Sequence, residues 1–250
     1  MIKWRRKAKI KTKKEMNKKM EYFLLGFLII LSVIFILAGF FLLGSAKPAE
    51  NISWGVNFSQ IQSQALGLDW KENYLALLEE MNVKNFKLSA YWGLIEPEKD
   101  NYNFDDLDWQ LEQAKKNNAK VILVVGMKAP RWPECHLPQW AKGLSKKEQQ
   151  ESILSMLKEV VSRYRNSNTI TVWQVENEPL FPFGECPWID KGFLKKEIDL
   201  VKEIDYTEKP VMITDSGEGS FWFAAAQLGN IVGTTMYRKV WFDEFERYFA

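Results

Sequence analysis

The stretch Trp173-Gln-Val-Glu-Asn-Glu-Pro179 ends a short apolar run with two carboxylates, an amide and a proline. The run itself, Thr171–Val175, is rich in β-branched residues and is typical of a buried strand. Proline lacks the N–H that a central strand needs, so the strand ends before Pro179. We therefore predict a strand whose carboxyl end presents Asn177 and Glu178.

Five further runs of the same kind lie along the chain. They are Ile52–Asn57, Phe86–Ala90, Val121–Gly126, Val211–Thr214 and Ile231–Thr235. Helical periodicity occupies the intervening segments Trp70–Asn82, Phe104–Asn118, Ser145–Arg165 and Asp190–Asp205. The third of these begins with Ser145-Lys-Lys-Glu148, which has the pattern of a capping box. Apolar strands that alternate with helices predict an α/β fold around a parallel sheet.

Two arrangements fit this alternation, namely a barrel and an open doubly wound sheet. No Gly-x-Gly-x-x-Gly follows the first predicted strand and no phosphate loop is present, which disfavours a nucleotide-binding open sheet. We predict no further strand after Thr235, so the pattern contains about six βα units.

Polar and aromatic side chains gather where the predicted strands end. In a barrel these positions and the loops after them form the active site. Aromatic rings suit the apolar face of a sugar, while carboxylates and amides bind its hydroxyl groups. Either tryptophan among these residues could equally be a packing residue. The candidate substrate-binding residues are Asn57, Trp92, Glu96, Trp132, Asn177 and Tyr237.

The stretch Trp173–Pro179 resembles the fourth-strand motif of the clan A glycoside hydrolases, in which the strand closes with Asn-Glu-Pro. Trp54–Asn57, Phe86–Pro97 and Pro97–Asp108 are similar to the clan's first strand, second strand and following segment. The resemblance covers about residues 52–240 and implies a (β/α)8 barrel, also called a TIM barrel. It departs from the clan at Ser89-Ala-Tyr91, where an arginine is frequent.

The resemblance implies that Glu178 is the general acid/base and that Asn177 bonds the sugar 2-hydroxyl. The implied reaction is retaining hydrolysis of O-glycosidic bonds in a β-linked glycan or glycoside, with no cofactor. Strand alternation would place Glu176 on the same side as Glu178, where it could support the site. Trp173 could help to exclude water from Glu178.

A retaining mechanism also needs a second carboxylate, about 5–5.5 Å from the first, as the nucleophile. In clan A this is a glutamate at the end of the seventh strand, and no glutamate follows Thr235 in such a setting. We expect the nucleophile beyond residue 250 and an incomplete, C-terminally truncated barrel over residues 52–250. The alternative is a non-catalytic carbohydrate-binding barrel displayed on a membrane.

The N-terminal region indicates the location of the protein. Residues 1–22 hold ten Lys or Arg and two Glu, and residues 23–44 form an uncharged apolar segment. At about 1.5 Å per residue, such a helix spans a membrane, and its basic flank stays in the cytoplasm. We predict a cytoplasmic tail, a signal-anchor helix at 23–44, a linker at 45–51 and an extracytoplasmic domain at the cell membrane. A cleaved signal peptide is the alternative.

Charge and cysteine content limit the partners. Residues 23–250 hold 24 basic and 30 acidic side chains, and an acidic body argues against nucleic-acid binding. We therefore expect carbohydrate and membrane as partners, with no signal for a particular oligomeric state. Cys135 and Cys186 both fall in the exported part, which favours a disulfide over free thiols. A metal site that includes His136 is a weaker alternative, and we expect no metal.

Overall fold

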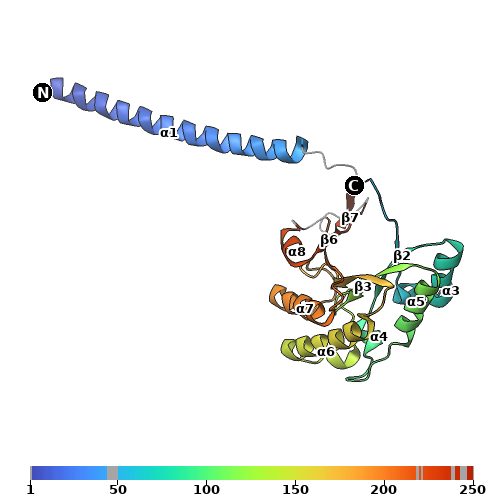
Figure 1. Cartoon of the computed structure of the whole chain (residues 1–250). Coiled ribbons are helices and arrows are strands. Elements are labelled where there is room, and N and C mark those ends of the chain that lie inside the picture. Colours follow the sequence, from blue (N-terminus) through green and yellow to red (C-terminus); the bar gives the residue numbers. More distant parts are fainter. Residues whose placement is uncertain are drawn as a thin grey trace. The chain divides into compact units, whose positions relative to one another are not determined.

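A computed structural model describes residues 2–43, 50–217, 220, 222–237, 240–242 and 247–249 of the chain. The chain forms two compact units, Met1–Ile52 and Ser53–Ala250. The first unit contains helix α1, Ile2–Leu43, which includes the basic tail as well as the apolar segment (Figure 1). Lysine, arginine, methionine and glutamate are good helix formers, so the helix extends into the tail.

One part of α1 has the properties of a membrane span. Lys18–Phe40 is long and apolar enough to cross a membrane by length and composition, a test that a signal sequence near the N-terminus also passes. Gly44 and most of the predicted linker, residues 45–49, lie outside the described residues.

The second unit is built on a parallel sheet whose six strands, within the described residues, follow one another in sequence order. They are β1 Val56–Asn57, β2 Asn85–Ser89, β3 Lys120–Val125, β4 Ile170–Val175, β5 Val211–Asp215 and β6 Ile231–Thr234. A doubly wound sheet reverses its strand order at one point, whereas this order does not reverse. The sheet is therefore a half-barrel, and all six predicted strands are confirmed.

Helices fill the connections between the strands. They are α2 Gln60–Ala65, α3 Trp70–Leu75, α4 Trp92–Ile95, α5 Asp105–Lys116, α6 Lys146–Tyr164, α7 Lys191–Ile204 and α8 Phe223–Leu228. A π-helical turn, η1 Ala76–Glu80, continues α3, and a 3-10 turn, η2 Gln139–Ala141, precedes α6. The four predicted helices are confirmed, and the capping box at Ser145 and Glu148 is present.

One prediction about the C-terminal region is wrong. The segment after Thr235 contains an antiparallel hairpin of β7, Val240–Phe242, and β8, Arg247–Phe249. Both strands are rich in aromatic residues, which favour extended backbone. The hairpin forms a separate two-stranded sheet and adds no strand to the half-barrel.

Side-chain alternation separates the two faces of the half-barrel. Leu123, Val125 and Trp173 point outward and join the large core, which also contains buried residues of α5, α6 and α7. Figure 1 shows these helices around the sheet. Val124 lies on the other face with Tyr91 and Ala129. Because side chains alternate along a strand, Lys87 and Gln174 share this inner face with Val124. The inner face is therefore the polar one, and it leads to the strand ends.

Candidate active site

A tight turn ends β4 and carries the predicted acid/base. Glu176 and Glu178 both adopt left-handed backbone, with φ of 59° and 46°. The Glu178 N–H donates to Thr214 Oγ1 at 2.9 Å, and the Asn177 N–H donates to the Lys128 carbonyl at 2.7 Å. Glu178 is only 8% exposed although it ends a strand. The ends of β3 and β5 thus fix the turn from both sides.

Lys128 fixes the same turn through its side chain. Its Nζ donates to the carbonyl oxygens of Glu178, at 3.0 Å, and Phe181, at 2.8 Å. Burial lowers the pKa of the Lys128 ammonium, and the negative charges of Glu134 and Glu178 oppose that shift. A buried cation with two carbonyl acceptors holds the backbone of Glu178 and balances the carboxylates around it.

Asn177 lies in a network of buried polar side chains. Its Nδ2 donates to Glu134 Oε2 at 3.1 Å, and its Oδ1 accepts from Gln174 Nε2 at 3.3 Å. Gln174 Nε2 also lies 3.3 Å from Thr214 Oγ1. These contacts define which end of the Asn177 amide donates and which accepts, and they leave one Nδ2 hydrogen for another partner.

Glu134 brings a second carboxylate to the site from the loop after β3. Burial raises the pKa of Glu134, the charge of Glu178 raises it further, and the Asn177 hydrogen bond and Lys128 oppose the shift. Glu134 adopts left-handed backbone at φ 71°. Gly184, at φ 92°, packs against it so closely that a Cβ at 184 would lie 2.5 Å from the Glu134 Cβ.

Lys87 is a further charged residue of the inner face. Burial lowers the pKa of its ammonium, while the charges of Glu178 and Glu134 oppose that change. The site therefore combines two carboxylates with two lysines in a largely buried setting. In such a setting charges interact more strongly than they do in water.

Three other predicted residues, Asn57, Tyr237 and Trp132, lie at or after the ends of strands. Asn57 ends β1 and Tyr237 follows β6, at the carboxyl ends of the two outermost strands. Trp132, in the loop after β3, is 62% exposed, and its ring lies 6.2 Å from that of Phe183 between centroids. Trp132 and Phe183 thus form an exposed aromatic pair on the loops that follow β3 and β4.

Two predicted substrate-binding residues are in the core. Trp92 is 0% exposed, packs edge-on against Trp140 at 5.7 Å, and donates from Nε1 to Glu96 Oε2 at 2.8 Å. Glu96 is 2% exposed and also accepts the N–H of Asp100 at 2.9 Å. The short helix α4 turns Trp92 inward, so this pair stabilises the fold and has no surface for a sugar. The prediction for Trp92 and Glu96 is wrong.

Two expectations for β4 also need correction. Trp173 faces the outer core, where its Nε1 donates to Asp205 Oδ2 at 2.6 Å, so it does not cover Glu178. The Glu176 side chain accepts the N–H groups of Met127 and Lys128 and lines a small cavity with Glu197 of α7, so it does not share the side of Glu178. Alternation fails for Glu176 because the left-handed turn begins at that residue.

The sequence reasoning missed Lys87, Lys128, Glu134, Gln174 and Thr214. A lysine and a glutamine within apolar strands are visible signals for Lys87 and Gln174, since alternation puts each on one face. Lys128 and Glu134 carry no comparable signal, because only the path of the loop after β3 brings them to Glu178.

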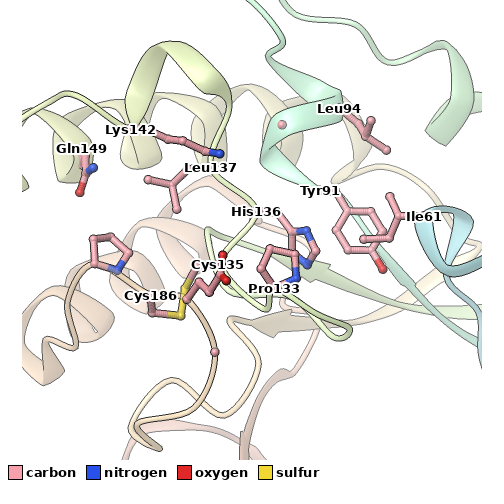
Figure 2. A pocket seen from close by; sticks show the side chains of 14 residues that line it. Ile61, Tyr91, Leu94, Pro133, Cys135, His136, Leu137, Lys142, Gln149 and Cys186 are labelled. Atoms are coloured by element: carbon pink, nitrogen blue, oxygen red, sulfur yellow. A yellow bond between two sulfur atoms is a disulfide. The ribbon is translucent and has the colours of Figure 1, made fainter. Parts of the chain in front are cut away.

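A disulfide joins the loops after β3 and β4. Cys135 and Cys186 are bonded at 2.00 Å between sulfurs. Both cysteines line a cavity of about 620 Å³. Figure 2 shows the disulfide there, with Ile61 packed against the cluster that contains Tyr91 in the same lining. Both thiols are bonded to each other, so they are not metal ligands with His136.

Two polar side chains of that cavity, His136 and Gln149, have partners within the protein. His136 Nε2 lies 3.1 Å from the Arg131 carbonyl. Gln149 donates from Nε2 to the Ala141 carbonyl at 3.0 Å and accepts from Trp188 Nε1 at 2.6 Å. Burial lowers the pKa of the His136 imidazole. These contacts stabilise the loops and point to no particular ligand.

Comparison with known proteins gives one family. Residues 54–193, more than half of the chain, match the family described as glycosyl hydrolase family 10. Endo-1,4-β-xylanase B of Thermotoga neapolitana is 29% identical over 143 residues, which are 54% of this chain and 39% of that protein. The chain thus spans well under half the length of that relative.

Solved structures show the fold. A β-galactosidase from Rahnella sp. R3 has a TM-score of 0.57 at 14% identity, over 78% of this chain and 41% of that one. Xylanase 10B from Thermotoga maritima has a TM-score of 0.53 at 19% identity, over 74% and 61%. Xylanase 10B from Thermotoga petrophila RKU-1, with xylobiose, has 0.50 at 22% identity, over 70% and 55%.

Proposed function

The chain belongs to glycosyl hydrolase family 10, and from that premise we propose that the protein hydrolyses β-linked glycans of the xylan type with Glu178 as its general acid/base. The family is consistent with the clan A resemblance of the β4 motif. The observation that carries the proposal is the buried turn in which Asn177 and Glu178 end β4 among Glu134, Lys87 and Lys128.

Glu178 would donate a proton to the leaving glycosidic oxygen and later take one from water. A general acid must be protonated when substrate binds, and a neighbouring negative charge favours the protonated form. Glu134 is a neighbour of this kind, since its carboxylate interacts electrostatically with Glu178, whereas the charges of Lys87 and Lys128 act in the opposite sense. Lys128 supports this role because its Nζ donates to the Glu178 carbonyl. The backbone that carries the Glu178 side chain is thereby held in place.

Asn177 and Trp132 would bind the sugar. The Asn177 amide uses one Nδ2 hydrogen for Glu134, so its other hydrogen is available to a sugar hydroxyl. Trp132 and Phe183 offer exposed rings on the neighbouring loops, on which a sugar ring could stack. Asn57 and Tyr237 would contribute contacts from the two edges of the half-barrel.

The proposed mechanism is retaining, so it needs a nucleophilic carboxylate about 5–5.5 Å from the acid/base carboxyl. The described residues form six parallel strands. A glutamate on a seventh strand would supply the nucleophile, as the clan resemblance implies. A second candidate function is a barrel that binds carbohydrate without hydrolysing it, and the exposed rings of Trp132 and Phe183 support sugar binding in either case.

We also propose that α1 anchors the domain outside the cytoplasm. The apolar stretch Lys18–Phe40 supports this location, and so does the basic segment before it. The disulfide between Cys135 and Cys186 is stable in oxidising compartments, which agrees with an exported domain.

The test uses the protein together with the seventh strand that the proposed mechanism requires, and compares it with its Glu178→Gln variant on xylan and on aryl β-xylosides. General acid–base catalysis contributes about 10²–10⁴-fold, so we expect Glu178→Gln to lower kcat by that factor on xylan. The loss should be smaller on a dinitrophenyl xyloside, whose leaving group needs little protonation. Glu185→Gln, an exposed acid on the same loop, is the matched control and should keep full turnover.

The outcomes separate the candidates. Unchanged turnover in Glu178→Gln would exclude the acid/base assignment. Binding of xylo-oligosaccharides by the wild type without turnover would favour the carbohydrate-binding barrel, and neither binding nor turnover would overturn the proposed function.

A further inference from the structure

Two buried carboxyl groups lie together behind the active site. Glu176 belongs to the turn after β4 and Glu197 belongs to α7, and they are 4% and 2% exposed. Both line one small cavity, where Glu197 Oε1 has no hydrogen-bond partner among the described residues and the charge of Glu176 acts on Glu197. Two buried carboxyl groups that share a cavity are not both ionised at low cost, and a proton on one of them allows it to donate to the other.

The contacts of Glu176 identify which group is ionised. Its Oε1 accepts the Met127 N–H at 2.8 Å, and its Oε2 accepts the Lys128 N–H. Two backbone donors favour a carboxylate, so the shared proton belongs to Glu197. Gly126, at φ 113°, permits this approach, because a Cβ there would lie 2.5 Å from Glu176 Oε1.

Lys128 links this pair to Glu178. Its N–H is held by Glu176, its carbonyl accepts the Asn177 N–H, and its Nζ donates to the Glu178 carbonyl. The backbone of Glu178 therefore depends on the position of Lys128, which depends on Glu176.

We propose that Glu176 and Glu197 form a carboxylate–carboxylic acid pair that positions Glu178 through Lys128, and that loss of their shared proton releases the ends of β3 and β4. Both are positioning residues, since neither reaches the inner face. The inference rests on the proposed function for the role of Glu178, but the contacts between the pair and the backbone do not.

The electrostatic surroundings fix the direction of the pH effect. Burial raises the pKa of Glu197 well above that of an exposed glutamate, and the charge of Glu176 raises it further. Burial also raises the pKa of Glu176, against which Lys128 and the two backbone N–H groups act. Lys128 from the β3 loop and Asp190 from the segment before α7 line the same small cavity as the pair. Asp190 is held by Lys146, which lowers its pKa to about 2.

The raised pKa of Glu197 makes the stability of the folded protein depend on pH. Between the ordinary glutamate range and its raised folded pKa, Glu197 is protonated in the folded protein and ionised in the unfolded one. Stability is therefore greatest below that range and decreases as the pH rises toward the folded pKa. Ionisation of Glu197 in the folded protein would place two adjacent negative charges in a buried site.

The experiment compares the full chain in detergent with Glu197→Gln, which keeps a hydrogen-bond donor but cannot ionise. The readouts are Tm and amide hydrogen exchange of the peptide that contains Met127 and Lys128, each measured from the ordinary glutamate range up to alkaline pH. In the wild type, Tm should decrease, and exchange, corrected for its intrinsic pH dependence, should speed up by as much as about tenfold for each pH unit between the ordinary glutamate pKa and the raised folded pKa, and then level off. In Glu197→Gln both should be nearly independent of pH.

Glu203→Gln removes an exposed carboxyl from the same helix and should leave the wild-type pH dependence intact. The alkaline limb of kcat should also move to higher pH in Glu197→Gln. Equal pH dependence of Tm and exchange in the wild type and Glu197→Gln would overturn the inference. If Glu197→Gln does not fold, the ¹³C shift of the Glu197 carboxyl is followed against pH in the wild type. A titration at the ordinary glutamate pKa would then overturn the inference. Tm, exchange and the ¹³C shift can all be measured without turnover. Failure of this inference would therefore be distinguishable from failure of the proposed function.

Discussion

At the scale of single residues, the turn after β4 places three functional groups by unusual backbone geometry. Glu176 and Glu178 occupy the left-handed region on either side of Asn177. For residues other than glycine this conformation costs about 1–3 kcal/mol each. The hydrogen bonds to Thr214 and Lys128 offset that cost. As a consequence of this backbone geometry, the Glu176 side chain points toward α7 and Asn177 contacts Glu134.

Substitutions at Glu134 test whether its hydrogen bond with Asn177 stabilises the site. Glu134→Ala leaves the buried Asn177 Nδ2 without its acceptor, which should destabilise the protein by about 1–3 kcal/mol and lower kcat/KM. Glu134→Gln keeps an acceptor oxygen and should retain more of both. Thermal unfolding and xyloside kinetics measure the two effects. Equal losses in the two variants would show that the charge of Glu134 matters, and the Asn177 contact does not.

At the scale of elements, the loops after β3 and β4 form one unit. Glu134, Trp132 and Lys128 lie in the first loop, and Phe183 and Gly184 lie in the second. The backbone bond from the Glu185 N–H to the Pro133 carbonyl, at 2.9 Å, and the disulfide between Cys135 and Cys186 join them. Neither loop contains a long helix of its own, so these cross-links set the position of the site residues.

Removal of the disulfide should therefore affect both stability and turnover. The bond closes a sequence separation of 51 residues, for which chain entropy predicts about 4 kcal/mol of stabilisation. Cys135→Ala with Cys186→Ala should lower Tm and raise KM for xylosides, because the loops move apart. Wild type treated with reductant is the control and should match the double variant. An unchanged Tm in both would contradict the role given to the bond.

At the scale of the whole molecule, charge and hydropathy divide the chain. Ten basic residues precede an uncharged apolar stretch, and the rest of the chain is mildly acidic. The two compact units follow the same division. Under the proposed topology, the acidic unit would act on glycans outside the cell while the basic segment stays at the cytoplasmic surface.

The anchor can be tested in the full chain. Leu31→Arg with Ile34→Arg places two charges in the apolar stretch, each costing about 2.5–3.5 kcal/mol at the centre of a membrane helix. The double arginine variant should be extracted from membranes by alkaline carbonate, whereas wild type and the matched double alanine variant should resist extraction. Extraction of the wild type would contradict the anchor, and a shortened mature mass would indicate a cleaved signal peptide.

Local patterns in the sequence determined the elements of this protein. The six parallel strands, four helices and the capping box at Ser145 follow from hydropathy period and capping chemistry, which act over a few residues. The same patterns placed Asn177 and Glu178 at a strand end. Hydropathy period did not predict the hairpin of β7 and β8, because each strand has only three residues and a period of two cannot be recognised over so short a run.

Tertiary structure alone decided how the site is assembled. Trp92 and Glu96 turned inward to the core, while Lys87, Lys128 and Glu134 came to Glu178 across sequence separations of more than 40 residues. No short-range pattern encodes such meetings, because they depend on the paths of two loops and on their cross-links. The sequence thus determined that Glu178 ends a strand, and the folded chain determined which charges surround it.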